Sequence, residues 1–333
     1  MDVLSDALRA VRLEGALFLN GEMHAPWCVN VPRGGEIAQA LKPAAERLAI
    51  CHLILEGRCW VQVDGEPPAA LTAGEVVTFP QGHAHVLGSS LQHAAVAIDH
   101  MVSPRMPELA RVRYGGHGER TVVVCGWFAY GDDLPDPLTP NLPRMFITPL
   151  RARPAGAWIE RSVAFVLEEG ARGSPGSDIV ASKVAEVLFA EALRGYVESI
   201  PDNHGGWLSG LRDPQVGRCL ALMHGNPARA WTVEALAQEV ATSRSVLAER
   251  FTERVGMPPM QYLTRWRMRL AARLLRSRQG PLARIAQEVG YESEAAFNRA
   301  FKRAYGMPPG LWRQRPPPAA PAAGRTALAA AAA

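Results

Sequence analysis

Two short stretches near the C-terminus carry side chains at matched spacing that could read the edges of DNA bases. Positions three to four residues apart share one face of a helix. Arginine donates two hydrogen bonds to guanine, asparagine pairs with adenine, and glutamate accepts from the N4 amino group of cytosine. The residues predicted to face outward, and therefore to be available for this chemistry, are Arg244, Ser245, Glu249 and Thr252 in the first stretch and Ala295, Asn298, Arg299 and Lys302 in the second.

A second group of candidate residues lies in the N-terminal half and could bind a small ligand. Imidazole and thiolate groups bind zinc or late transition metals, and they also form hydrogen bonds with organic molecules. A metal at His52 and His85 is one alternative. Because a stable site usually has three or four protein ligands, we favour an organic ligand and expect no resident cofactor. The candidate ligand-binding residues are His52, His83, His85, Trp60 and Cys125.

The outward-facing group lies within an internal repeat. The tetrapeptide Ala-Gln-Glu-Val at 237–240 recurs at 286–289, and Gly-Met-Pro-Pro at 256–259 recurs at 306–309. Between these matches the second copy contains one more residue than the first. Repetition at this spacing is typical of a supersecondary unit that occurs twice.

Each copy of the repeat predicts two helices joined by a tight turn, which is the helix-turn-helix arrangement. Ser and Thr are preferred N-caps, and Gly commonly ends a helix. The boundary signals are Thr232, Ser243 and Gly256 in the first copy, and Pro281, Gly290, Ser293 and Gly306 in the second.

The second helix of each copy is predicted to be amphipathic, because its apolar residues recur at helical spacing. Residues 260–277 between the copies predict one further helix. At 1.5 Å per residue it spans about 27 Å, which could hold two reading helices on successive major grooves about 34 Å apart. The apolar, inward-facing residues are Leu247, Phe251 and Val255 in the first copy, and Phe297, Phe301 and Tyr305 in the second.

The distribution of charge favours a polyanionic partner for the C-terminal part. The net charge of the chain is only +4, but residues 212–315 hold 18 Lys and Arg against 8 Asp and Glu, a local net charge of +10. The remainder of the chain therefore carries −6. A concentrated basic excess is typical of nucleic-acid binding, although a solvated basic surface without a partner is the alternative.

The N-terminal part predicts an antiparallel β-sandwich or small barrel. Short runs with a period of two are separated by Gly, Pro and Asp, which is typical of such folds. The predicted strands are Ile50–Leu55, Cys59–Val63, Val76–Phe79, Ala94–Ile98 and Thr121–Phe128.

On these features, the C-terminal third resembles the DNA-binding domain of the AraC/XylS regulators. The resemblance covers roughly residues 212–315 and implies that 243–255 and 293–305 enter the groove. Ser245 and Glu249 depart from the larger or basic groups of many relatives, which suggests a weaker first reading helix. The residues that carry the resemblance are Pro281, Ile285, Ala286, Gly290, Tyr291, Ser293, Phe297, Arg299, Phe301, Lys302, Gly306, Pro309, Trp312 and Arg313.

The N-terminal part resembles the cupin-type sensor domains of one branch of the same family. Residues 74–85 match the second cupin motif, G(X)5PxG(X)2H, and residues 52–57 are similar to the end of the first. The full cupin metal set requires an HxH pair and a Glu before that first strand. Residues 42–49 offer no such histidines, so the resemblance argues against a metal-dependent enzyme.

These observations predict an α+β chain with two domains. Residues 1–200 form an antiparallel, cupin-like β-barrel followed by helices, 201–211 a linker, 212–315 an all-α double helix-turn-helix domain, and 316–333 a disordered Pro- and Ala-rich tail. An amphipathic helix is expected at 178–198, and its apolar stripe either covers the barrel or joins two subunits. The stripe consists of Val180, Val184, Val187 and Leu188.

The composition is that of a globular, cytoplasmic protein. Five scattered cysteines without a CxxC pair indicate neither a disulfide framework nor a zinc ribbon. No apolar run approaches the roughly 20 residues of a membrane span, and the N-terminus lacks the pattern of a signal peptide.

We therefore expect a transcription regulator rather than an enzyme. Its expected partners are double-stranded DNA, a small-molecule effector, a second copy in a homodimer, and RNA polymerase if it activates; no membrane partner is expected. The alternatives are a metal-dependent cupin enzyme fused to a DNA-binding domain, a repair methyltransferase and an architectural DNA protein. The missing HxH pair argues against the first, and the scattered cysteines argue against the second.

Overall fold

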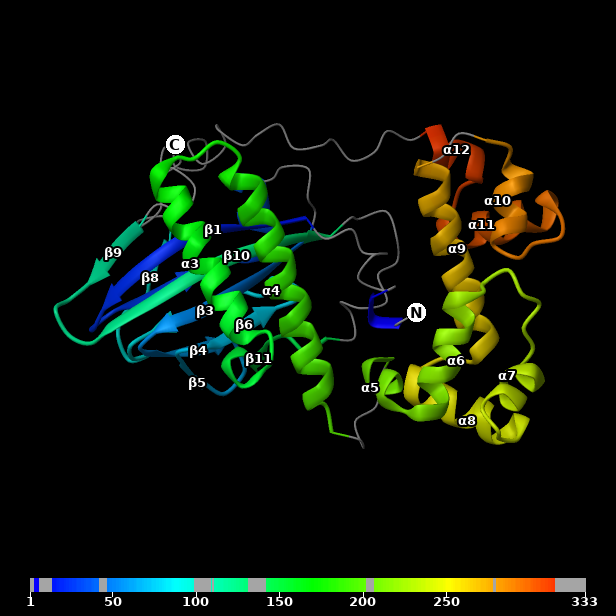
Figure 1. Cartoon of the computed structure of the whole chain (residues 1–333), viewed down its shortest axis with the longest axis horizontal. Helices are drawn as coiled ribbons and strands as arrows, with labels where there is room; N and C mark the ends of the chain where they lie inside the picture. Colours follow the sequence, from blue (N-terminus) through cyan, green and yellow to red (C-terminus); the bar gives the residue numbers. More distant parts are fainter. Residues whose placement is uncertain are drawn as a thin grey trace. The chain divides into compact units, whose positions relative to one another are not determined.

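The structure is a computed structural model that describes residues 3–5, 14–41, 47–98, 109, 111–130, 142–201, 207–277 and 280–314. These residues form two compact units (Figure 1). A sheet-rich unit contains the described residues of 13–132 and 142–198, and a helical unit contains those from Ser199 onward together with Val3–Ser5. The predicted tail at 316–333 lies outside the described residues.

The sheet-rich unit consists of two sheets packed face to face. The six-stranded sheet has the order β11-β6-β3-β10-β1-β9, and the five-stranded sheet has the order β5-β4-β7-β2-β8. The strands are β1 (Glu14–His24), β2 (Cys28–Val31), β3 (Arg47–Glu56), β4 (Arg58–Val63), β5 (Ala69–Thr72), β6 (Glu75–Phe79), β7 (His85–Gly88), β8 (Val96–Ala97), β9 (Arg111–Gly115), β10 (Arg120–Tyr130) and β11 (Phe146–Pro149).

The two sheets do not close into the predicted barrel, because no ladder joins a strand of one sheet to a strand of the other among the described residues. Instead the chain passes from β3 to β4 through Gly57 alone, whose φ of 77° suits a residue without a side chain. A Cβ atom there would lie 2.3 Å from the carbonyl oxygen of Arg120. The class of fold is confirmed, and the barrel is corrected to a sandwich.

Two helices cover the outer face of the six-stranded sheet (Figure 1). They are α3 (Gly156–Arg172) and α4 (Ser177–Ser199). Phe189 of α4 packs against Phe128 of β10, with 4.7 Å between the ring centroids. Strand β3 is therefore buried on both faces: Ile50, His52 and Ile54 point between the sheets, and their neighbours point toward the helices. Two shorter elements complete the unit, α2 (Gly34–Leu41) and a 3₁₀ turn, η3 (Leu150–Ala152).

The helical unit confirms the predicted repeat. Its first helix-turn-helix is α7 and α8, its second is α10 and α11, and α9 runs between them (Figure 1). The hydroxyl groups of Thr232, Ser243 and Ser293 accept hydrogen bonds from the backbone at the N-termini of α7, α8 and α11. The helices are α5 (Trp207–Arg212), α6 (Pro214–Gly225), α7 (Val233–Glu239), α8 (Arg244–Val255), α9 (Pro259–Ser277), α10 (Leu282–Glu288), α11 (Glu294–Tyr305) and α12 (Pro309–Gln314).

Both reading helices end as expected. Gly256 and Gly306 have φ angles of 78° and 73° and form left-handed C-caps. The turn between the helices of each copy also needs a left-handed residue. It is Gly290 in the second copy, whereas Ala241 holds a φ of 52° in the first.

Candidate nucleic-acid interface

The outward faces of α8 and α11 carry the residues predicted from the sequence. Leu247, Phe251, Phe297 and Phe301 are fully buried, which sets the rotation of both helices about their axes. The opposite faces are therefore exposed or half-buried. The exposed candidates are Arg244, Ser245, Glu249, Thr252, Ala295, Arg299 and Lys302, and Asn298 is half-buried.

The candidates differ in whether their side chains already form ion pairs or hydrogen bonds within the protein. Arg244 forms an ion pair with Glu234 of α7 at 2.7 Å, and the Thr252 hydroxyl donates to the Ala248 carbonyl at 2.6 Å. Within the described residues Arg299 and Lys302 make no ion pair, so their charges are available to an anionic partner. The second helix therefore carries the stronger positive field, and the first carries the carboxylate of Glu249.

Val246 is a surface residue on α8 that the sequence analysis did not name. It is 48% exposed and lies beside Ser245 at the N-terminal end of the helix. An apolar side chain there can contact the 5-methyl group of thymine. The sequence could have indicated this residue, because Val246 is apolar but lies outside the stripe formed by Leu247 and Phe251.

The orientation of α8 depends on Asp213, which precedes α6. One carboxylate oxygen accepts from the backbone of Gln215 and Val216, both at 3.0 Å, and the other accepts from Arg250 of α8 at 2.7 Å. Burial alone would raise the pKa of Asp213, but the hydrogen bonds from Val216 and Arg250 outweigh it and lower the pKa. The ionised carboxylate thus ties α6 to the first reading helix.

Helix α5 is a part of the helical unit that the sequence analysis missed. Residues 207–211 fall in the segment predicted as a linker, yet Trp207 is only 2% exposed. Its indole N–H donates to the Tyr262 hydroxyl at 3.1 Å, and that hydroxyl also pairs with the Nε2 atom of His224 at 2.8 Å. His224 stacks on Trp266 with 3.7 Å between ring centroids, and burial lowers its pKa to about 3.

In the sheet-rich unit, three of the predicted ligand-binding residues meet in a single chain of hydrogen bonds. His52 on β3 pairs through Nδ1 with the Cys125 thiol at 2.8 Å, and through Nε2 with the Nε2 atom of His85 at 2.7 Å. The Nδ1 atom of His85 donates to the backbone carbonyl of His83 at 2.8 Å. Cys125 and His52 belong to one sheet and His85 to the other, so the chain bridges the sandwich.

The carbonyl at one end determines the direction of every proton in this chain. Because a carbonyl only accepts, His85 carries its proton on Nδ1 and accepts on Nε2. His52 then donates from Nε2 and accepts from the Cys125 thiol. Burial lowers the pKa of His52 well below its ordinary value and that of His85 to about 4, and it raises the pKa of Cys125. All three groups are therefore neutral near pH 7.

The cluster does not fit a bound metal in this geometry. Two ring nitrogens that share a tetrahedral zinc ion at about 2.05 Å each lie roughly 3.3 Å apart. The nitrogens of His52 and His85 are 2.7 Å apart, and the thiol lies against the other nitrogen of His52. In the described part of the chain no group of three or more His, Cys, Asp or Glu residues could hold a metal ion.

The side chains of the remaining two candidates do not take part in the hydrogen bonds of the buried cluster. Trp60 is 44% exposed, because side chains alternate along β4 and its neighbours Cys59 and Val61 take the inward positions. His83 is half-buried and contributes its backbone carbonyl to the hydrogen-bonded chain. The structure therefore brings together His52, His85 and Cys125, but not Trp60.

Two helix-turn-helix pairs joined to a cupin-like sandwich define a DNA-binding regulator, and comparisons with known proteins agree. Residues 2–198 match the family model described as Cupin, and residues 236–315 match the one described as Helix-turn-helix domain. The chain is 34% identical, over 96% of its own length and 100% of the other, to an AraC-like transcription regulator of Streptomyces antibioticus. The chain belongs to the AraC-like transcription regulators with an N-terminal cupin domain.

The chain is also similar to a second curated regulator and to one solved structure. The RCS-specific transcriptional activator RclR of Escherichia coli is 27% identical over 95% of this chain and 98% of its own. A crystal structure of the DNA-binding domain of AdpA with a target DNA is 28% identical, covers 31% of this chain and 91% of its own, and has a TM-score of 0.30. Since the relatives are transcription regulators, the expectation of a regulator rather than an enzyme is confirmed.

No helix in the described residues is long and apolar enough to cross a membrane.

Proposed function

We propose that this regulator reads a bipartite DNA site with α8 and α11 in successive major grooves. The observation that carries the proposal is that α8 and α11 expose equivalent faces. The rotation of each helix is fixed by two buried residues on its opposite side, Leu247 and Phe251 in α8 and Phe297 and Phe301 in α11. Arg299 and Lys302 supply donors for guanine and for phosphates, and Asn298 suits adenine. Glu249 accepts from cytosine, Val246 contacts thymine, and Arg244, Ser245, Thr252 and Ala295 complete the surface.

Selection of duplexes from a random pool by the purified chain tests this proposal. We expect an enriched site with two protected segments one helical turn apart, and an affinity that falls steeply with salt because bound counterions are released. Uniform protection without an enriched sequence would overturn base reading and would favour an architectural protein.

We further propose that the sheet-rich unit receives a small-molecule effector near the buried chain of His52, His85 and Cys125. An effector that enters between the sheets must replace the hydrogen bond between His52 and His85, which joins the two sheets beside the stacked rings of His85 and Phe79. His83 lies next to this chain, and Trp60 is on the outer face.

The double variant His52→Ala, His85→Ala tests the sensing proposal. Once a natural effector has been identified from the regulated genes, we expect the variant to lose the response while basal DNA binding is kept, because the readers lie in the other unit. Trp60→Ala is the matched control on the outer face and should respond like the wild type. An unchanged effector affinity in the folded double variant would place the pocket elsewhere.

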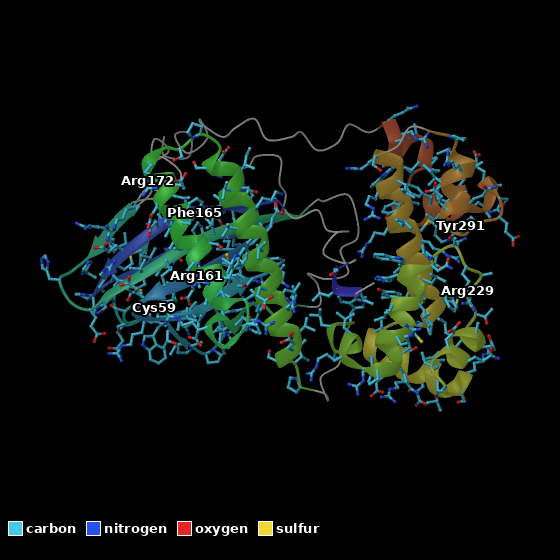
Figure 2. The ribbon with its side chains drawn as sticks, viewed as in Figure 1. Cys59, Arg161, Phe165, Arg172, Arg229 and Tyr291 are labelled. Carbon is cyan, nitrogen blue, oxygen red and sulfur yellow. The ribbon has the colours of Figure 1, made fainter. Side chains whose placement is uncertain are left out.

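We propose that the exposed faces of α3 and α4 form the interface of a homodimer. Phe165 and Trp158 on α3 are 53% and 51% exposed, and Val180 and Val187 on α4 are 43% and 39% exposed. Phe165 lies between Arg161 and Arg172 along α3 (Figure 2). Several large apolar groups on one surface are typical of an interaction site.

The stripe predicted from the sequence is corrected in one position. Leu188 is fully buried against the sheet, whereas Val180 and Val187 are exposed and Val184 is half-buried. One side of helix α4 therefore covers the sandwich, and the other side faces outward. The partner surface shifts toward α3.

Light scattering of Phe165→Glu alongside the wild type tests the dimer. We expect a dimeric wild type at tens of micromolar and a folded, monomeric variant, because an ionised glutamate in an apolar contact is costly. The control variant Trp60→Glu, which changes an exposed aromatic residue on the other sheet, should remain dimeric. A monomeric wild type would overturn the proposal.

The remaining assignments follow from a DNA partner. A regulator acts in the compartment that holds the DNA, which supports a cytoplasmic location. A contact with RNA polymerase is proposed only for the case in which the protein activates transcription, and reporter assays with and without the regulator would decide the sign.

A further inference from the structure

Two segments of the helical unit meet at one side chain of a third, that of Arg267 near the middle of α9. Its Nε atom donates to the carbonyl of Pro227 at 2.8 Å, and one terminal nitrogen donates to the carbonyl of Arg229 at 2.9 Å. Both carbonyls belong to the loop between α6 and α7. On the other side, the guanidinium carbon lies 5.9 Å from the ring centroid of Tyr291, in the turn between α10 and α11.

The turn of the second repeat approaches this junction closely. Gly290 has a φ of 82°, and a Cβ atom built on it would lie 2.8 Å from a terminal nitrogen of Arg267 and 2.9 Å from the carbonyl oxygen of Ala228. The loop of the first repeat and the turn of the second are therefore in contact with the same guanidinium group. Figure 2 labels Arg229, whose carbonyl accepts from this group, and Tyr291, whose ring lies near it.

Two of the partners of Arg267, Tyr291 and Arg229, contact a reading helix or the helix that supports it. The Tyr291 ring meets that of Phe297, a buried residue of α11, at 5.9 Å and 61°. On the first side, Arg229 forms an ion pair with Glu239 of α7 at 3.1 Å, and α7 packs on α8. Arg267 is therefore linked through Tyr291 to α11, and through Arg229 to α7, the helix that supports α8.

The turn of the first repeat lacks the aromatic ring that the turn of the second repeat places near Arg267. The backbone N–H of Thr242 donates to Ala237 at 3.0 Å, and that of Tyr291 donates to Ala286 at 2.8 Å, so the two residues are equivalent in the repeat. The first repeat has a small threonine at this position and the second has an aromatic ring. The loop before the first repeat supplies the carbonyl groups and the second repeat supplies the aromatic ring, so the junction needs both repeats.

The chemistry of the junction requires a guanidinium group. Two carbonyl oxygens accept from two different nitrogens of one planar fork, while the carbon atom of the same group lies over an aromatic ring. Lysine has a single nitrogen and cannot reproduce this arrangement. No carboxylate contributes to these contacts, so the junction works through geometry rather than through charge neutralisation.

We propose that Arg267 is a positioning residue that fixes the distance and rotation between α8 and α11, and that it thereby determines the spacing between the two half-sites that the protein accepts. This inference rests on the proposed bipartite reading of DNA. Insertion of one base pair displaces a half-site by about 3.4 Å and rotates it by about 35°. A rigid junction rejects such a site, and a loosened one tolerates it.

Binding of the full-length protein to a spacing series tests the inference. The probes are the duplex selected by the wild type and derivatives with one base pair inserted or removed between the protected segments. For the wild type we expect affinity to fall about tenfold or more on each derivative, and for Arg267→Ala we expect this ratio to shrink to about threefold or less. Arg265→Ala removes an exposed charge from the same helix and should weaken all probes alike, leaving the ratio unchanged.

Two further comparisons keep the test decisive. If Arg267→Ala does not fold, Arg267→Lys keeps the charge and most of the stem, and it should still lose part of the ratio. A folded Arg267→Ala or Arg267→Lys protein with the wild-type ratio would overturn the inference, as would a wild type that binds all spacings equally. A wild type that selects no sequence at all would instead overturn the proposed function.

Discussion

Glu249 and Arg299 occupy the same position in the two reading helices, because each is the sixth residue after a serine N-cap, Ser243 or Ser293. Both side chains are exposed on the face opposite the buried phenylalanines. One repeat therefore presents a carboxylate where the other presents a guanidinium. The two reading helices differ in sign at their centres, so the two half-sites are expected to differ in sequence.

Replacement of Arg299 by alanine is expected to weaken specific binding by about 1–3 kcal/mol, because a bidentate contact with guanine is lost. Thermal stability should change little, since Phe297 and Phe301 keep their packing. Glu249→Ala should instead relax selectivity at a single base pair of the other half-site. Titrations at matched salt measure both effects, and wild-type affinity in folded Arg299→Ala would show that this residue is not a reader.

Val246 is expected to contact a thymine methyl group. Replacing that thymine by deoxyuridine removes only the methyl group and should weaken binding by about 0.8 kcal/mol, roughly fourfold. The variant Val246→Ala should bind both duplexes with nearly equal affinity. A scan of deoxyuridine through the selected site is the measurement, and a scan without any sensitive position in the first half-site would contradict this assignment.

Trp207→Ala is expected to destabilise the helical unit by about 3–5 kcal/mol, because it removes a buried indole and leaves the Tyr262 hydroxyl with one partner fewer. Urea unfolding followed by circular dichroism measures the change. Trp60→Ala, at an exposed tryptophan in the other unit, should shift the free energy of unfolding by only about 0.5 kcal/mol. A Trp207→Ala protein as stable as the wild type would show that α5 is dispensable.

The sheet-rich unit is expected to lose stability as the pH falls from about 6.5 toward 4. Burial holds the pKa of His85 at about 4 and that of His52 well below its ordinary value near 6.5, so the unfolded chain binds more protons in this range. The contribution is complete above pH 6.5 and decreases by about 1–3 kcal/mol toward pH 4. Unfolding curves across this range should flatten in the variant His52→Leu, His85→Phe; an equal slope in both proteins would contradict the assignment.

The double helix-turn-helix was determined by local sequence. N-cap serines, left-handed glycines and apolar residues at helical spacing act within a few residues of one another, and the repetition of these signals confirmed each copy against the other. The outward faces of α8 and α11 followed from the same periodicity. Val246 on α8 was missed, because the sequence pattern alone does not show which way an apolar residue within a polar segment points.

Only the tertiary structure decided how distant segments meet. Whether the strands close into a barrel or remain two sheets depends on long-range pairing, which alternation along single strands does not specify. The meeting of His52, His85 and Cys125, the burial of Leu188 and the anchoring of Trp207 through Tyr262 likewise join residues far apart in the chain. Arg267 is the clearest case: its position on α9 is evident from the sequence, but its two carbonyl partners are backbone atoms, which no side-chain pattern reveals.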